Sequence, residues 1–153
     1  MFKINLEIVK TDSMNADFIK LIKLLDEDLE DRYGALQKQY EKHNKVDYKN
    51  DIVIIYQDNI AVACGAIKQY EIDTIELKRI FVIKQKRQQG LAKLIVHELE
   101  DLARIKGYKY ALLETGIRQH EAINLYKNNG YNVIQNYGPY IENTNSICMR
   151  KTL

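Results

Sequence analysis

One stretch, residues 74–106, constrains the fold more than any other, because it predicts a strand, a short polar loop and a long helix in direct succession. Residues 74–83 are rich in Ile, Leu, Phe and Val, which favours a strand. After Gly90, apolar residues recur at helical spacing, which predicts a helix that ends at Gly107. The apolar stripe of that helix contains Leu91, Leu94, Ile95, Leu99, Leu102 and Ile105.

The junction between this loop and the helix predicts an anion site. The first N–H groups of a helix have no partner within the helix, and the helix dipole favours negative charge at that end. Gly90 lets a ligand approach the backbone closely, and Lys84, Lys86 and Arg87 add positive charge. We interpret the junction as a pyrophosphate site.

Length and composition predict a single domain over residues 1–153. The chain is long enough to bury a core, and its 46% hydrophobic and 29% charged residues are ordinary for a globular protein. A net charge of +2 and scattered basic residues argue against nucleic acid as a partner. No apolar run approaches the roughly 20 residues of a membrane helix, and Cys64 and Cys148 are expected to be buried free thiols. These features favour a cytoplasmic protein.

The order of predicted elements indicates the fold class α/β (α+β), with a mixed, mostly antiparallel sheet flanked by helices. Strands are predicted at 2–8, 51–56, 60–67, 74–83, 108–113, 131–134 and 146–149. A first helix, capped by Asp12 or Ser13, should bury Phe18, Leu21, Ile22, Leu25 and Leu29. A short helix is predicted at 119–129 and stops at Gly130. The polar segment 35–49 is the least regular part and a candidate lid.

Three local motifs, in this order of elements, resemble the GNAT superfamily of N-acetyltransferases over essentially the whole chain. The first motif is Arg87-Gln88-Gln89-Gly90-Leu91-Ala92, which is similar to the family's R/Q-x-x-G-x-G/A signature between strand and helix. The second runs from Ala122 to Tyr131 and is similar to the family's A-x-x-L-Y-x-x-x-G-F/Y segment. The third is Glu76, on the strand where several family members carry a catalytic glutamate.

The resemblance implies that the bound anion is the pyrophosphate of acetyl-CoA, held by backbone N–H groups of Gln88, Gln89, Gly90, Leu91 and Ala92 beside Arg87. It also implies that the pantetheine arm lies along the backbone of Ile80, Phe81 and Val82. The chain departs from the family pattern at Gln119, where an asparagine is common, so a side-chain contact from this position to the cofactor is less expected. No metal is expected, because His43, His97 and His120 lack ligand spacing.

The resemblance also suggests the catalytic residues. Glu76 is the candidate general base, acting directly or through an ordered water; the alternative is a solvent-side strand residue that pairs with Lys78. Tyr126 is the candidate acid toward the thiolate of coenzyme A, because a phenol is protonated at neutral pH. The alternative for Tyr126 is a core tyrosine, in a chain with 11 tyrosines.

The acceptor site is less well predicted. We expect Tyr33, His43, Tyr137 and Tyr140 to contribute, the last two because a Gly-Pro turn with flanking tyrosines forms a rigid aromatic wall. An ordinary surface turn and a solvated His43 are the alternatives.

Two functions follow from this reading. One is an acetyl-CoA-dependent N-acetyltransferase that acts on a primary amine of a small molecule, amino acid or peptide. The other is a silent acetyl-CoA-binding sensor or assembly module. The family modifies many amines on one scaffold, so the fold does not select the acceptor. A homodimer is the default expectation.

Overall fold

The central sheet has seven strands within residues 4–34 and 51–153, the part of the chain that this computed structural model describes. The strands are β1 Leu6–Thr11, β2 Asp51–Gln57, β3 Ile60–Glu71, β4 Thr74–Val82, β5 Tyr110–Gly116, β6 Asn132–Ile134 and β7 Ser146–Thr152. Their order in the sheet is β1-β2-β3-β4-β5-β7-β6. Among these strands only β4 and β5 pair in parallel; the other neighbouring pairs are antiparallel. The predicted fold class is therefore confirmed.

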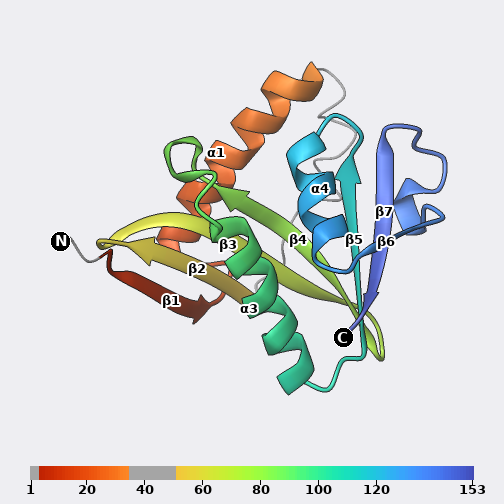
Figure 1. Cartoon of the computed structure of the whole chain (residues 1–153), viewed down its shortest axis with the longest axis horizontal. Coiled ribbons are helices and arrows are strands. Elements are labelled where there is room, and N and C mark those ends of the chain that lie inside the picture. The colour runs from red at the N-terminus through yellow and green to blue at the C-terminus, as the bar shows by residue number, and fades with distance from the viewer. Residues whose placement is uncertain (1–3, 35–50) are drawn as a thin grey trace.

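Helices cover both faces of this sheet (Figure 1). The helix α1 (Ala16–Tyr33) packs on one face, whereas α3 (Leu91–Ile105) and α4 (His120–Asn128) pack on the other. The strand β2 shows why both faces are covered, since Val53 and Ile55 point to the α3 side and Ile52 and Ile54 to the α1 side. No helix in the described ranges is long and apolar enough to cross a membrane.

Several predicted boundaries need correction. Asn15, rather than Asp12 or Ser13, caps α1, because its Oδ1 accepts hydrogen bonds from the N–H groups of Asp17 and Phe18 at 2.9 and 3.1 Å. The apolar residues of segment 2–8 alternate with polar ones, which predicts a half-buried strand, but this prediction of burial is wrong. Leu6 and Ile8 are exposed, and β1 is an edge strand paired only with β2. The strands β3, β5 and β7 all extend further toward the C-terminus than predicted.

The predictions for the ends of α3, for most of the buried face of α1 and for the cysteines agree with the structure. The helix α3 begins after Gly90 and stops at Gly107, as predicted. The first helix buries Phe18, Leu21, Leu25 and Leu29, although Ile22 is only half-buried and Tyr33 is buried in addition. Cys64 and Cys148 are buried free cysteines, also as predicted.

The helix α3 lies unusually close to β3 at Gly65. A Cβ at this position would lie 2.6 Å from Cγ2 of Ile95 and 2.7 Å from Cδ1 of Leu99. Gly65→Ala should therefore lower the free energy of unfolding by about 1–3 kcal/mol, the usual cost of overpacking a core. Urea unfolding measures this change. A value within about 0.5 kcal/mol of the wild type would show that α3 can shift away from the sheet at little cost.

The feature that positions the site is the separation of β4 from β5. Their parallel ladder pairs Thr74 with Tyr110 and ends with Leu77 opposite Leu113. Both strands then continue, to Val82 and Gly116, and Figure 1 shows them diverging. A bulge in β4 accompanies this divergence. Cys64 pairs with Phe81 and Ala66 with Lys78, so one residue of β3 lies opposite two of β4, Arg79 and Ile80. Arg79 adopts a positive φ of 58°.

Candidate active site

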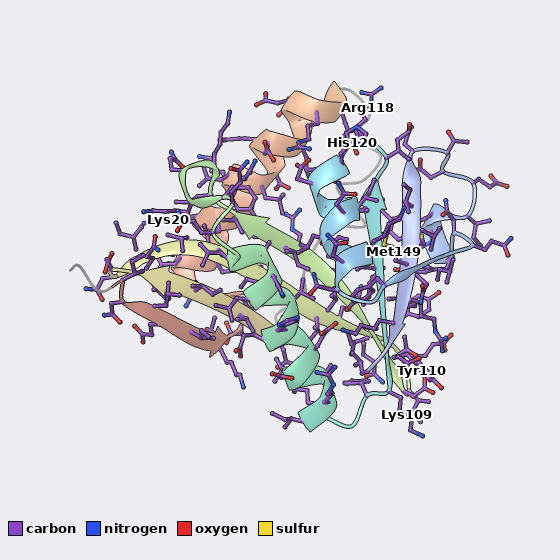
Figure 2. All side chains as sticks on the ribbon, viewed as in Figure 1. Lys20, Lys109, Tyr110, Arg118, His120 and Met149 are labelled. Carbon is purple, nitrogen blue, oxygen red and sulfur yellow. The ribbon has the colours of Figure 1, made fainter. Side chains whose placement is uncertain are left out.

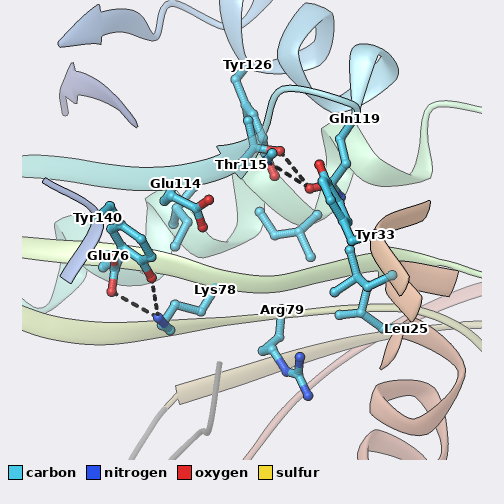
Figure 3. Close-up of a pocket in the computed structure, with 14 residues that line it drawn as sticks. Leu25, Tyr33, Glu76, Lys78, Arg79, Glu114, Thr115, Gln119, Tyr126 and Tyr140 are labelled. Atoms are coloured by element: carbon cyan, nitrogen blue, oxygen red, sulfur yellow. Dashed lines mark hydrogen bonds and ion pairs between the residues drawn. The ribbon is translucent and has the colours of Figure 1, made fainter. Parts of the chain in front are cut away.

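A pocket lies between β4 and β5 where the two strands diverge (Figure 3). The carboxyl ends of neighbouring parallel strands are a common place for ligands, because the connections that follow them leave a crevice. The residues that line the pocket come from α1, β4, β5, α4 and the 3₁₀ turn Gly138–Tyr140. They are Leu25, Leu29, Tyr33, Glu76, Leu77, Lys78, Arg79, Ile80, Glu114, Thr115, Gly116, Gln119, Tyr126 and Tyr140.

The predicted anion junction has exposed residues and unused backbone donors. Gln88, Gln89 and Gly90 are exposed, and Gln88 and Gly90 adopt positive φ angles of 64° and 81°. The first helical bond at this end runs from the N–H of Leu94 to the carbonyl of Gly90, at 3.1 Å. Within the described residues, no hydrogen bond occupies the N–H groups of 88–93. The junction can therefore receive an anion.

The side chains of the motif 87–92 make structural contacts that could not be predicted from the motif itself. The Nε of Arg87 donates to the carbonyl of Val82 at 3.0 Å, and its guanidinium forms an ion pair with Asp28 of α1 at 3.4 Å. Arg87 thus ties the loop back to β4 and α1, and Asp28 offsets part of its charge. Leu91 points into the core, so only its backbone faces the junction. Ala92 is partly buried against the same core.

The strand β4 has one unoccupied edge beyond Leu77. On the β3 side, Phe81 and Val82 pair with Cys64 and Ala63. On the β5 side, no strand of the described chain pairs with residues 78–82. The side chains of Phe81 and Val82 lie in the two cores, so these residues can meet a ligand only through their backbone. An extended ligand could add to this edge as a further strand would.

Glu76 is buried and held by two partners. It is 7% exposed, its Oε1 lies 3.3 Å from Nζ of Lys78, and its Oε2 accepts a hydrogen bond from the hydroxyl of Tyr137 at 2.5 Å. Lys78 also donates to the hydroxyl of Tyr140 at 3.4 Å. The pairing of Glu76 with Lys78 agrees with the alternative considered from the sequence, but its solvent-side position does not. Burial raises the pKa of Tyr137, and the charge of Glu76 adds to this rise.

The turn that carries Tyr137 and Tyr140 is held together by side-chain hydrogen bonds. Nδ2 of Asn136 donates to the carbonyls of Tyr140, Asn143 and Ser146 at 3.1, 3.0 and 3.2 Å. The rings of Tyr137 and Tyr140 meet edge to face, with centroids 5.7 Å apart. Tyr137 and Tyr140 thus form an aromatic wall, and Tyr140 lines the pocket, whereas a role of this wall in acceptor binding stays a prediction.

Glu114 is a pocket residue that sequence reasoning missed. It lies near the end of β5, where Oγ of Ser146 donates to its Oε1 at 2.9 Å. Burial raises the pKa of Glu114 to about 7; the hydrogen bond from Ser146 and the charge of Lys78 oppose this rise, and the charge of Glu76 adds to it. The sequence did contain a feature that could have identified Glu114. Its carboxylate directly follows the apolar run Ala111–Leu113, at the carboxyl end of a strand, where ligands often bind.

Tyr126 and Gln119 approach the pocket from the α4 side. Tyr126 is 7% exposed, and its ring packs edge to face on Tyr131 with centroids 5.9 Å apart. Burial raises the pKa of Tyr126, and the charge of Glu114 adds to this rise, so its hydroxyl stays protonated. Oε1 of Gln119 accepts from Oγ1 of Thr115 at 3.2 Å and from the N–H of Gly116 at 3.0 Å. Gln119 thus holds the end of β5.

Tyr33, expected at the acceptor site, closes one end of the pocket. Its hydroxyl accepts a hydrogen bond from the N–H of Arg118 at 3.3 Å, and a Cβ on Gly116 would lie 1.6 Å from that hydroxyl oxygen. Arg118 in turn donates to the carbonyl of Arg32 at 3.0 Å. Figure 2 shows Arg118 beside the end of α1. Only a glycine at 116 allows this contact between α1 and β5.

His43 and the rest of the candidate lid 35–49 lie outside the described residues. His97 is exposed on α3, and its Nε2 lies 3.1 Å from the side-chain oxygen of Asn129. Within the described ranges, no three His, Cys, Asp or Glu side chains form a group that could hold a metal ion.

Comparisons with known proteins agree with this architecture. Residues 18–131 match the Acetyltransferase (GNAT) family. An IAA acetyltransferase from Azospirillum brasilense is 32% identical over 97% of this chain and 99% of its own length. A crystal structure from Klebsiella pneumoniae, named as an acyl-CoA N-acyltransferase, is 33% identical with a TM-score of 0.81 and 97% coverage of both chains.

A third comparison concerns the fold alone. The PaiA N-acetyltransferase from Thermoplasma acidophilum, solved in complex with coenzyme A, has a TM-score of 0.75 at 16% identity, with 97% of this chain and 99% of that chain covered. The family match covers the junction at Gly90, both diverging strands and Tyr126. The chain therefore belongs to the GNAT family of acetyltransferases.

Proposed function

We propose that the protein transfers an acetyl group directly from acetyl-CoA to a primary amine of a small molecule, amino acid or peptide. The observation that carries this proposal is the pocket between β4 and β5, on the same chain as a helix, α3, whose first N–H groups are unpaired within the described residues. Acetyl-CoA consists of a nucleotide with a pyrophosphate and a long pantetheine arm. Its pyrophosphate would bind at those N–H groups, and its arm would lie along the free edge of β4.

In this proposal, the N–H groups of 88–92 bind the pyrophosphate, and the pantetheine arm pairs with the backbone of 80–82. The bulge at Arg79 and Ile80 supports this placement, because it turns backbone groups out of the β3 ladder. A backbone N–H near Ile80 would then polarise the thioester carbonyl.

The acceptor would enter between Tyr33 and the wall formed by Tyr137 and Tyr140. Tyr126 would donate to the sulfur as the thiolate leaves. A pocket carboxylate would take the proton from the amine. Glu76 is the base predicted from the sequence, and Glu114 lines the same pocket.

Thermal stabilisation by acetyl-CoA tests the first half of this function. A ligand that binds only the folded state must stabilise it, by about 2.7 kcal/mol at a concentration of 100 Kd. We expect a melting temperature that rises with acetyl-CoA concentration. No shift at saturating acetyl-CoA would contradict the proposed site.

Release of free thiol in the presence of different amines tests the second half. The panel of amines should contain polyamines, amino acids and peptides, and IAA, which has no primary amine, should be assayed beside it because a relative carries that name. Thiol release with one class would identify the acceptor. Stabilisation without thiol release from any amine would favour a silent acetyl-CoA-binding module instead.

A further inference from the structure

Both carboxylate oxygens of Glu76 already have a partner within the protein, so each competes with that partner for a substrate amine. Lys78 contacts its Oε1 and Tyr137 donates to its Oε2. Glu76 also lies within the paired part of the sheet, opposite Leu112, before the strands diverge. A general base needs a free lone pair within reach of the proton that it takes.

Glu114 meets this requirement. It is the first residue of β5 beyond the last ladder pair, Leu77 with Leu113, so it lies where the strands open. Ser146 occupies its Oε1, and within the described residues its Oε2 has no hydrogen-bond partner. Figure 3 shows the carboxyl group of Glu114 in the pocket, between the Glu76–Tyr140 side and the Thr115–Tyr126 side.

We propose that Glu114, rather than Glu76, is the general base that takes the proton from the acceptor amine, and that Glu76 is a positioning residue for Lys78 and Tyr137. This inference rests on the proposed function and names the base of that same site.

The surroundings of Glu114 favour this role. Burial raises its pKa to about 7, so the carboxylate is a stronger base than an exposed glutamate and is still largely ionised just above neutral pH. Charged or titratable groups face it from β4, β7, α4 and the Gly138–Tyr140 turn. They are Glu76, Lys78, Cys148, Tyr126 and Tyr140.

The proposed step balances its protons. The acceptor enters as an ammonium and gives one proton to Glu114. Its nitrogen lone pair then forms a bond to the acetyl carbon, and the bond from that carbon to sulfur breaks. The thiolate takes the hydroxyl proton of Tyr126. The second proton lost by the nitrogen restores Tyr126, and Glu114 releases its proton to solvent.

The charge of Glu114 affects the pKa of Tyr126 in a direction that favours the reaction. The ionised carboxylate of Glu114 adds to the raised pKa of Tyr126. When Glu114 accepts a proton, that contribution disappears, and Tyr126 becomes a better acid as the thiolate forms.

The pH dependence of kcat/KM tests the proposal, with Glu114→Gln and Glu76→Gln as matched variants. The amine is the one that the wild-type protein acetylates fastest in the screen above. Wild-type kcat/KM should rise as the pH increases through about 7, the pKa of Glu114. Glu114→Gln should lose this rise and about 10²–10⁴-fold in rate. Glu76→Gln should melt at a lower temperature, because Lys78 loses its buried partner, yet keep the rise.

Hydroxylamine supplies a second readout, because it is a weaker base than an alkylamine and is largely neutral at neutral pH. Glu114→Gln should therefore lose much less rate with hydroxylamine than with the alkylamine. Stabilisation by acetyl-CoA, measured on the same samples, should match the wild type in both variants.

A third readout does not require turnover. The pKa of Glu114 is raised in the folded state above its ordinary value of 4.5, so folding binds a proton between these values. The contribution of Glu114 to stability is therefore lost as the pH rises from about 4.5 to about 7. Glu114→Gln should remove this part of the pH dependence of the melting temperature.

Two results would overturn the assignment. One is a Glu114→Gln variant with the wild-type pH profile and a rate within about threefold of the wild type. The other is a Glu76→Gln variant that loses the rise of kcat/KM with pH while Glu114→Gln keeps it, which would restore Glu76 as the base. The proposed function fails separately, if the wild-type protein is not stabilised by acetyl-CoA.

Discussion

Gly90→Val should weaken acetyl-CoA binding by about 100-fold or more, which corresponds to about 2.8 kcal/mol. Gly90 caps α3 with a φ of 81° and lies among the amides proposed to bind pyrophosphate. A Cβ at this position meets no atom within 4 Å in the free protein, so the side chain clashes only with a bound ligand. The folded state should lose about 1–3 kcal/mol from the left-handed backbone.

Gly107→Val is the matched control for that strain. Gly107 lies at the other end of α3, has a φ of 91° and also has open space around a Cβ. The two variants should therefore lose similar stability, whereas only Gly90→Val should lose stabilisation by acetyl-CoA. Titration calorimetry measures both affinities. Wild-type affinity in Gly90→Val would rule out a pyrophosphate at this junction.

Tyr126→Phe should lower kcat by about 10²–10³-fold, within the range for a lost general acid, while acetyl-CoA affinity stays close to the wild-type value. Within the described residues, the hydroxyl of Tyr126 makes no hydrogen bond, and its ring packs on Tyr131. Phenylalanine preserves that packing, so stability should change little.

Tyr131→Phe is the control for Tyr126→Phe, because the two rings are in contact. The hydroxyl of Tyr131 donates to the buried Glu100 at 2.8 Å, on α3 and away from the pocket lining. Its removal should lower the melting temperature and leave kcat within about twofold of the wild type. Equal kcat in Tyr126→Phe and the wild type would exclude Tyr126 as the acid.

The elements of this protein could be predicted from its sequence because their signals are local. The continuous apolar run of residues 52–55 favours a strand at β2, and an apolar spacing of three to four residues predicts the helix α3. Gly90 and Gly107 mark the two ends of α3 because both positions need a positive φ. The exposed amides at Gly90 follow directly, since every helix leaves its first donors unpaired.

The site residues were only partly predictable. Glu76, Gln119, Tyr126 and Tyr140 were named from motifs and line the pocket. Glu114 was not named, because its strand was expected to end at Leu113. Arg87 was read as a source of positive charge, yet it joins the loop to Val82 and Asp28. No local pattern contains these partners.

The pattern of apolar, polar and glycine residues in the sequence thus determines where strands and helices lie, because side-chain periodicity and helix capping act within a few residues. The tertiary structure decides the chemistry of the pocket. Glu76 gains its second partner only when Tyr137 reaches it from 61 residues away, and the pKa of Glu114 rises to about 7 only when surrounding elements bury its carboxyl group. Burial and pairing depend on how β4 and β5 separate, and that separation comes from long-range packing.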